Sequence, residues 1–397
     1  MFEPRRANGL VLGILAYVMS SDSNILKKGS NISIALLFLL LPLYFKTPFF
    51  VPVAFIGFLA ILALLLKIQT YENKTLWFVP FYLILGIIQL IINPDLKIYE
   101  YITRLSAIII FIVTLSVVTT YYDKKYDKYL LFSFIFVILY ALYSAPSYIL
   151  GYENFLIPGT CLENNLSVFN HLRCSTFGEG NYFGGYLSLM ILIFSQRPSF
   201  MLLSLFCVLV SFSPTSMLIW LYLFIRKYIF KGDYGWVLIS SIASFLIFIS
   251  ILTLDISIIR FFFGDSETSS FWERFEFIRS SFKMWSDNMI IGIGLGQFGY
   301  YLSDYTVFNH LITSANDGAR YIPNSNLAEI LSEQGLYGFV FYFDILYKLC
   351  YLNHPLLNHY ELIIVFIIIG LAMPTLFQIV IAALLGVLIS KFSKMPI

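Results

Sequence analysis

Long apolar runs separated by shorter polar connections make up most of the 397-residue chain. An α-helix needs about 20 apolar residues to cross the hydrocarbon core of a bilayer, and twelve runs reach or approach that length. These runs cover residues 34–44, 50–66, 76–92, 101–118, 129–150, 182–194, 200–212, 217–229, 237–254, 336–352, 362–373 and 375–389. The pattern predicts an all-α polytopic membrane protein with about 12 transmembrane helices. The range is about 11 to 13, because the N-terminal apolar segment at 10–19 is a possible extra span and the last two runs could form one hairpin broken at Pro374.

The composition agrees with the run pattern. Hydrophobic residues make up 59% of the chain and charged residues 12%, and the mean hydropathy is +0.82. Soluble domains carry about 25% charged residues, so a soluble class is excluded. The net charge is only +2, and the absence of a dense basic stretch excludes nucleic acid as a partner.

The placement of Lys and Arg predicts the orientation of the chain, because cytoplasmic connections carry an excess of these residues. They cluster on alternate connections, with Lys46 and Lys97 as single exceptions. The clustered residues are Lys27, Lys28, Lys67, Lys74, Lys124, Lys125, Lys128, Arg197, Arg226, Lys227, Lys231, Lys348, Lys391 and Lys394. Two large loops, 151–180 and 255–335, are then left outside, which in a bacterial inner membrane is the periplasm. The second loop is acidic, so each of its arginines is an individual feature.

The first loop contains two cysteines, Cys161 and Cys174, thirteen positions apart. A periplasmic location is oxidising and would permit a disulfide between them. Spacing alone does not establish the geometry that a disulfide needs, so a bonded pair and two free thiols both remain open.

The first loop ends in the sequence HLRCSTFGEGNYFGGYL, which places Arg173 before a glycine-rich entry to the next span. An arginine at such a position is costly unless it is paired or solvated. Arg173 could be a snorkelling arginine beside a glycine-packed helix, or it could bind the phosphate of a lipid, because a guanidinium grips phosphate with two hydrogen bonds. Glu179 could be its ion-pair partner or a catalytic carboxylate.

The second loop contains an apolar repeat at three- or four-residue intervals, which predicts an amphipathic helix over residues 267–285 at the membrane surface. Arg274 lies near the edge of its apolar stripe and is a candidate for function. Arg279 and Lys283 share one face, either as a plain solvated face or with an anion between them.

The second loop also contains a glycine-rich stretch and a predicted short helix. The sequence GIGLGQFG at 292–299 lacks the context of a nucleotide-binding loop and predicts a tight turn.

Asn326 and Glu329 have the spacing of a capping box that opens a short helix over residues 326–334, which Gly335 would end. Glu329 and Glu333 then share a face, so that one raised pKa could give a general base, or they are one cap and one solvated glutamate. The four histidines show no metal-ligand spacing, so no metal site is predicted.

The two loops together resemble those of bacterial O-antigen polymerases (Wzy type) and of the wider O-antigen ligase/polymerase superfamily. The resemblance rests on the architecture and on three stretches, RCSTFGEGNYFGGYL, RFEFIRSSFKMWSDNMIIGIGLGQF and PNSNLAEILSEQGLYG. Ligases of this superfamily carry a histidine where Pro323 stands here, and this difference favours a polymerase.

The resemblance implies a glycosyltransferase with a membrane-embedded fold of the GT-C type that needs no cofactor. It would join undecaprenyl-pyrophosphate-linked repeat units, as donor and acceptor, into O-antigen polysaccharide at the periplasmic face of the inner membrane. A chain-length regulator protein and membrane lipids are candidate partners. Arginines at the bilayer surface would stabilise the leaving pyrophosphate, and a carboxylate would orient or deprotonate the acceptor. The expected pyrophosphate ligands are Arg173, Arg274, Arg279, Arg320 and Asn324, and the expected catalytic carboxylates are Glu179, Glu329 and Glu333.

Three alternatives remain open. Within the superfamily these are an O-antigen ligase and a polymerase for capsule or exopolysaccharide. In a different class, a flippase for the same lipid-linked units would need charges in a central cavity. Arg104, near the outer end of the run at 101–118, is the best intramembrane charge for a flippase, although it could equally line a pyrophosphate site.

Overall fold

The structure is a computed structural model, and its described part is helical. It describes residues 23–40, 74–93, 96–149, 180–211, 214–228, 270–308, 311–313, 321, 323, 325–372 and 378–393. The longer helices are α2 (Ser23–Leu40), α4 (Phe78–Ile92), α5 (Ile98–Tyr121), α6 (Asp127–Ile149), α8 (Gly180–Phe194), α9 (Pro198–Ser211), α10 (Pro214–Tyr228), α13 (Ser270–Asp287), α14 (Phe298–Tyr305), α17 (Gly335–Cys350), α18 (His359–Ala372) and α19 (Ile379–Phe392). Within these ranges the extended structure is one isolated bridge between Leu352 and Ser393, so the all-α class is confirmed for the described part.

Two helical segments of the described chain are both long and apolar enough to cross a membrane, Thr75–Ile92 and Ile98–Tyr121. The 24 residues of α5 extend about 36 Å at 1.5 Å per residue, which exceeds the roughly 30 Å hydrocarbon core. Shorter apolar helices occur at Phe183–Phe194, Pro198–Val208, His359–Leu371 and Val380–Phe392. The predicted runs at 50–66 and 237–254 lie outside the described residues, so the count of about twelve spans and the GT-C fold stay predictions.

Helix α19 lies at the centre of the bundle. Every residue from Val380 to Ile389 is buried, as expected for a helix that is apolar on all sides. It packs on α5 and α8, and Gly386 allows the closest approach. A Cβ atom added at Gly386 would lie 2.8 Å from Val118 Cβ, so the contact between α19 and α5 requires glycine there.

The far end of α5 is held by a buried carboxylate. The side chain of Asp127, at the start of α6, accepts a hydrogen bond from Arg197 Nη2 at 2.9 Å and lies 3.1 Å from Lys391 Nζ. The hydroxyl of Tyr122, just after α5, also donates to Asp127. Asp127 therefore joins the end of α5, the turn between α8 and α9, and the last turn of α19.

We expect Asp127→Ala to destabilise the fold by about 3 kcal/mol, because it leaves the Arg197 and Lys391 cations without their shared carboxylate. Thermal unfolding of the purified full-length protein in detergent would measure the loss. Asp123→Ala is the comparison variant, because it loses only an ion pair with Lys125 that is more than half exposed and a cap on the Lys125 amide, so its loss should be about 1 kcal/mol. Equal melting temperatures for the two variants would contradict this role for Asp127.

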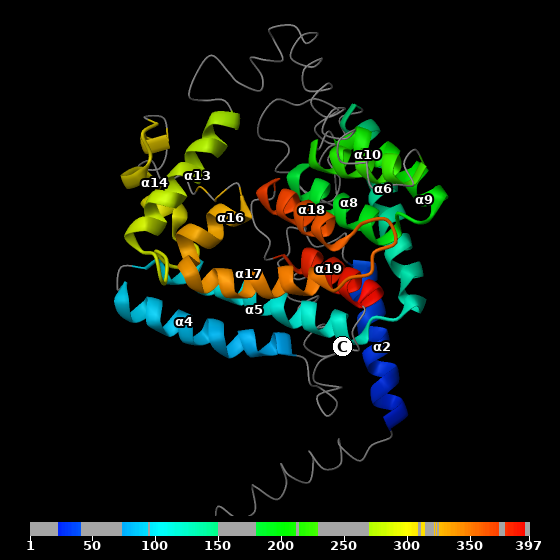
Figure 1. The fold of residues 1–397 in the computed structure, drawn as a ribbon, viewed down its shortest axis with the longest axis horizontal. Coiled ribbons are helices and arrows are strands. Elements are labelled where there is room, and N and C mark those ends of the chain that lie inside the picture. The colour runs from blue at the N-terminus through cyan, green and yellow to red at the C-terminus, as the bar shows by residue number, and fades with distance from the viewer. Residues whose placement is uncertain are drawn as a thin grey trace, which may run out of the picture.

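The elements of the second loop lie at the opposite end of α5. Figure 1 shows α13 and α14, in yellow, beside one end of the α4–α5 pair, and α8, α9 and α10, in green, toward the other end. Between α13 and α17 the chain forms the short helix α16 (Asn326–Glu329) and a π-helical turn, η7 (Ile330–Gln334). Helix α13 contacts η7, α14 and α16, so residues more than forty positions apart meet at this end.

Candidate functional site

Buried polar side chains from α4 and α5 hold the turn that follows α13. The Gln89 amide nitrogen donates to the carbonyl oxygens of Ile291, at 2.5 Å, and Glu333, at 2.9 Å. The Tyr101 hydroxyl donates to the Gln89 amide oxygen at 3.0 Å. Buried polar groups require hydrogen-bond partners, and this glutamine in an apolar run finds its partners in two segments about 200 and 240 residues away.

The π-helical turn supplies carbonyl groups to the glycine-rich turn. The amide of Ile293 donates to Ser332 O at 2.8 Å, and the amide of Gly294 donates to Glu333 O at 3.3 Å. Gly292 has a φ of +69°, and a Cβ atom there would lie 2.4 Å from the Glu333 carbonyl carbon. The two backbones can approach this closely only with glycine at position 292. Single π turns of this kind are frequent at functional sites.

This packing brings two carboxylates to one arginine. Arg104 Nε, from α5, lies 3.1 Å from Glu329 Oε1 and 3.9 Å from Glu333 Oε2. Glu333 also accepts hydrogen bonds from the amides of Gly296, at 2.8 Å, and Phe298, at 3.4 Å. Glu329 and Glu333 are both buried, whereas the Arg104 side chain is 17% exposed. The glycine-rich turn thus fixes the Glu333 carboxylate, and the two carboxylates together orient the guanidinium.

The charge balance of this group is unusual. Burial raises the pKa of the Glu333 carboxyl above its ordinary range, although Arg104 and the amides of Gly296 and Phe298 act in the opposite direction. Two buried carboxylates face one guanidinium, and the raised pKa of Glu333 favours its neutral form, which reduces the negative charge around Arg104.

Arg104 lines a cavity of about 260 Å³ at the start of α5. One side of the cavity is a single face of α5, and the other side comes from the glycine-rich turn, the start of α14 and Tyr321. The lining residues are Tyr99, Glu100, Thr103, Arg104, Ala107, Gly296, Gly299, Tyr300 and Tyr321. Glu329 and Glu333 lie behind Arg104 and are not among them. An anion in this cavity would meet a cation whose orientation is already fixed.

Another buried carboxylate, that of Glu276, anchors α13 to α14. Glu276 binds Arg279 with two hydrogen bonds and accepts from the Thr306 hydroxyl, at 2.8 Å, and the Val307 amide, at 2.9 Å. Burial raises the pKa of Glu276, but hydrogen bonds from Arg279, Val307 and Thr306 outweigh it and leave the pKa below its ordinary value. The Arg279 guanidinium also donates to Tyr305 O at 3.0 Å, so Arg279 links α13 to the end of α14 and stabilises the joint between the two helices.

The depressed pKa of Glu276 predicts a pH dependence. Its stabilisation is present above the carboxyl pKa of the unfolded chain, about 4.3, and is lost as the pH falls through the lower folded value. We expect Glu276→Gln to lower the melting temperature at pH 7, and the difference from the wild type to shrink below about pH 4. Thermal unfolding across this range would measure it. A difference independent of pH would contradict the assignment.

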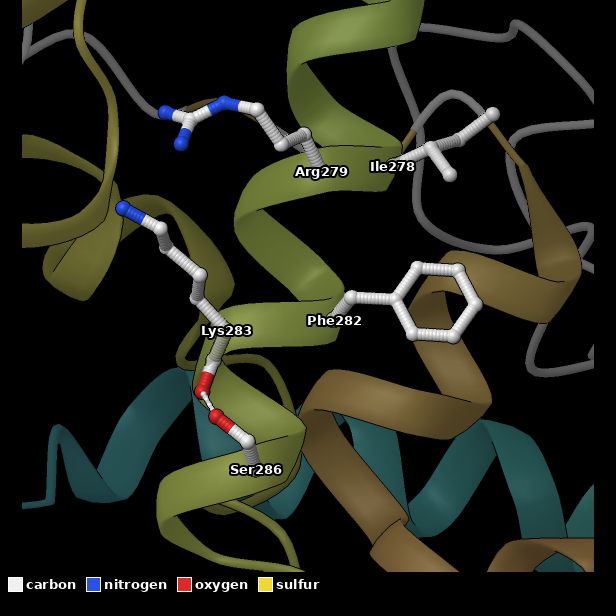
Figure 2. Close-up of a pocket in the computed structure, with 5 residues that line it drawn as sticks. All are labelled: Ile278, Arg279, Phe282, Lys283 and Ser286. Carbon is white, nitrogen blue, oxygen red and sulfur yellow. Dashed lines mark hydrogen bonds between the residues drawn. The ribbon is translucent and has the colours of Figure 1, made fainter.

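A larger hollow of about 450 Å³ lies against α13 itself. Its described lining comes from α13 alone and consists of Ile278, Arg279, Phe282, Lys283 and Ser286. Figure 2 shows Arg279 and Lys283 on one side of the helix, with Ile278 and Phe282 on the other. The described lining of this hollow comes from one helix, whereas the Arg104 cavity lies between α5, the glycine-rich turn, α14 and Tyr321.

The structure brings together only part of the predicted site. Glu329 and Glu333 meet at Arg104, whereas Arg279 lies in the joint between α13 and α14. The other predicted residues, or their side chains, lie outside the described part of the chain, so their roles stay predictions. These are Arg173, Glu179, Arg274, Arg320 and Asn324, together with the cysteines Cys161 and Cys174.

The capping box predicted at Asn326 is wrong. Ser325 occupies the N-cap position, its side chain makes no capping hydrogen bond, and Asn326 is already the first residue of α16. The Glu329 carboxylate turns to Arg104 instead, because an ion pair in a buried site outweighs a local cap. The end of the short helix is as expected, since Gly335 has a φ of +60° after η7.

Sequence reasoning did not include Arg104 or Glu276 among the site residues. The sequence marks Arg104 as a charge in an apolar run that suits a flippase or could line a pyrophosphate site, and its spacing of four from Glu100 places both on one face of a helix. That face could have been identified from the sequence. The partners of Arg104 lie 225 and 229 positions later in the chain, which no local pattern indicates.

Residues 199–343 match the family model described as O-Antigen ligase. The matched segment contains the glycine-rich turn, Glu329 and Glu333, and it ends inside α17; Arg104 lies outside it. Members of this family are membrane-associated and glycosyltransferase-like, and the match does not separate polymerases from ligases. No curated protein matches the chain.

Proposed function

We propose that this chain, which the match over residues 199–343 supports as a member of the O-antigen ligase/polymerase superfamily, is an O-antigen polymerase. It would join undecaprenyl-pyrophosphate-linked repeat units at the periplasmic face of a bacterial inner membrane. The observation that carries the proposal is the buried pair of carboxylates holding Arg104 at the wall of a cavity near the end of a membrane-length helix.

Glycosyl transfer from a lipid pyrophosphate requires a fixed cation at the depth of the lipid headgroup. In the reaction, the acceptor hydroxyl oxygen attacks the anomeric carbon of the donor sugar, and the bond from that carbon to the pyrophosphate oxygen breaks. The lipid pyrophosphate leaves with the bonding electrons, and the hydroxyl proton passes to a base. Negative charge therefore develops on the pyrophosphate, where a preorganised guanidinium stabilises the transition state most.

Arg104 is suited to this role by its position and its partners. It lies about one and a half turns from the start of α5, which places it near the expected membrane surface. Glu329 and Glu333 position the guanidinium without lining the cavity, so we assign them to orientation of Arg104 rather than to direct proton transfer. Of the carboxylates predicted as the base, Glu179 then remains the one to test as a proton acceptor.

Two observations bear on the choice between polymerase and ligase. The matched family model is described as an O-Antigen ligase, which favours a ligase as the second candidate. Position 323 is a buried proline, where the ligases of this superfamily carry a histidine. We weigh the side chain at position 323 more heavily, because proline can neither transfer a proton nor donate a hydrogen bond.

Deletion of the gene, followed by gel analysis of lipopolysaccharide, tests the proposal. A strain that lacks a polymerase keeps core with a single repeat unit, and a plasmid carrying the wild-type gene should restore the ladder of long chains. Bare core would instead identify a ligase, and accumulation of lipid-linked units on the cytoplasmic side would identify a flippase. An unchanged ladder after deletion would contradict all three.

A further inference from the structure

We propose that the outer part of the Arg104 cavity is a sugar-binding subsite in which Tyr300 and Glu100 hold the sugar ring attached to the bound pyrophosphate. This inference rests on the proposed function and adds a substrate class to the site. It starts from the side chains that line the cavity beyond Arg104, which include three tyrosines, a threonine and a glutamate.

The first argument is chemical. A sugar ring carries a patch of C–H groups on one face and hydroxyl groups around its rim. An aromatic ring covers the C–H patch, and a carboxylate accepts hydrogen bonds from the hydroxyls. Glu100, from the α5 side of the cavity, and Tyr300, from the α14 side, present both groups next to each other, and Tyr99 and Tyr321 add two further aromatic side chains. A volume of about 260 Å³ admits one ring rather than an oligosaccharide.

The second argument is rigidity. The Tyr300 hydroxyl donates to Glu100 Oε1, and Lys97 Nζ lies 5.7 Å from the centroid of the Tyr300 ring. The Thr103 hydroxyl donates to Tyr99 O at 2.8 Å, which turns its oxygen into an acceptor. The ring and the acceptors are therefore held in place before a ligand enters, and preorganisation lowers the entropy cost of binding.

The third argument is the order of the groups along α5. Arg104 and Glu100 are four residues apart on one helical face, which separates them by about 6 Å along the axis. In a lipid-linked glycan the prenyl tail lies in the membrane, the pyrophosphate at its surface and the first sugar beyond it. Glu100 lies toward the end of the helix and Arg104 toward its middle, so the two residues follow the same order. Because Glu100 is negative, the subsite suits a ring without a carboxylate.

The test is a kinetic assay of full-length protein in proteoliposomes with undecaprenyl-pyrophosphate-linked repeat units extracted from the deletion strain. We expect Tyr300→Ala to raise KM for these units about tenfold, with kcat changed by less than about threefold, because stacking contributes to binding in the ground state. Tyr300→Leu, which keeps most of the side-chain volume, should raise KM similarly. Tyr300→Phe keeps the ring and loses only the hydrogen bond to Glu100, so it should raise KM less than Tyr300→Leu does.

Two further variants complete the design. Glu100→Gln should raise KM several-fold, and Tyr347→Ala, an exposed tyrosine on α17 outside the cavity, should leave both constants unchanged. Unaltered KM values for Tyr300→Ala, Tyr300→Leu and Glu100→Gln would overturn the subsite while the wild-type protein still polymerises. Absence of polymer with the wild-type protein would overturn the proposed function itself, so the two failures are distinguishable.

Discussion

Arg104→Ala should reduce the rate of polymerisation at least about 100-fold, because removal of one preorganised group that stabilises transition-state charge typically costs that much. The variant loses the only Arg or Lys side chain among the described residues that line the cavity. The rate is measured in proteoliposomes with lipid-linked repeat units, at matched amounts of protein. In cells, the same variant should leave core with a single repeat unit instead of a ladder.

Stability is a competing explanation for this loss, because Arg104→Ala also leaves two buried carboxylates without their cation. The double variant Arg104→Ala with Glu329→Gln removes the charge of the nearer carboxylate, 3.1 Å from Arg104 Nε, and should recover the melting temperature without recovering turnover. Lys283→Ala removes a cation from α13 outside the cavity and should turn over normally. Wild-type turnover by the double variant would contradict the role of Arg104.

Gly292→Ala is expected to have the second largest effect, a loss of about 2–5 kcal/mol in stability together with a loss of activity. The added Cβ atom would lie 2.4 Å from the Glu333 carbonyl carbon, and the φ of +69° is strained for alanine. Both effects displace η7 from the glycine-rich turn and move Glu333 away from Arg104. Thermal unfolding in detergent gives the stability, and the proteoliposome assay gives the rate.

Gly370→Ala is the matched control for this substitution. Gly370 lies in α18, and a Cβ atom there would meet the Tyr342 hydroxyl at 3.4 Å, an ordinary contact distance. Alanine also favours helix over glycine by about 1 kcal/mol, so this variant should be as stable as the wild type or slightly more so. If Gly292→Ala melted at the same temperature as Gly370→Ala, the close approach of the turn to η7 would be contradicted.

The site shows what kinds of information a single sequence contains. The i, i+4 spacing of Glu329 and Glu333 predicted that their carboxylates share a face, and both do lie within 4 Å of one guanidinium nitrogen. The glycines at 292–299 predicted a tight turn, and the positive φ angles of Gly292, Gly294 and Gly296 agree with it. The capping box failed because a short local hydrogen bond competed with a buried ion pair from another helix.

Three properties follow from the sequence without the structure: the helical class of the described chain, two helices of membrane length, and the polar character of the loop that follows α13. These properties depend on composition and on periodicity within one segment, and both can be counted along the chain. Other features are visible only once the helices are packed together. Arg104, Glu329 and Glu333 form one buried group, and Gln89 hydrogen-bonds to the turn beside it. Glu276 forms an ion pair with Arg279. Such pairings depend on how distant helices pack, and packing is set by the shapes of many side chains together rather than by any local pattern.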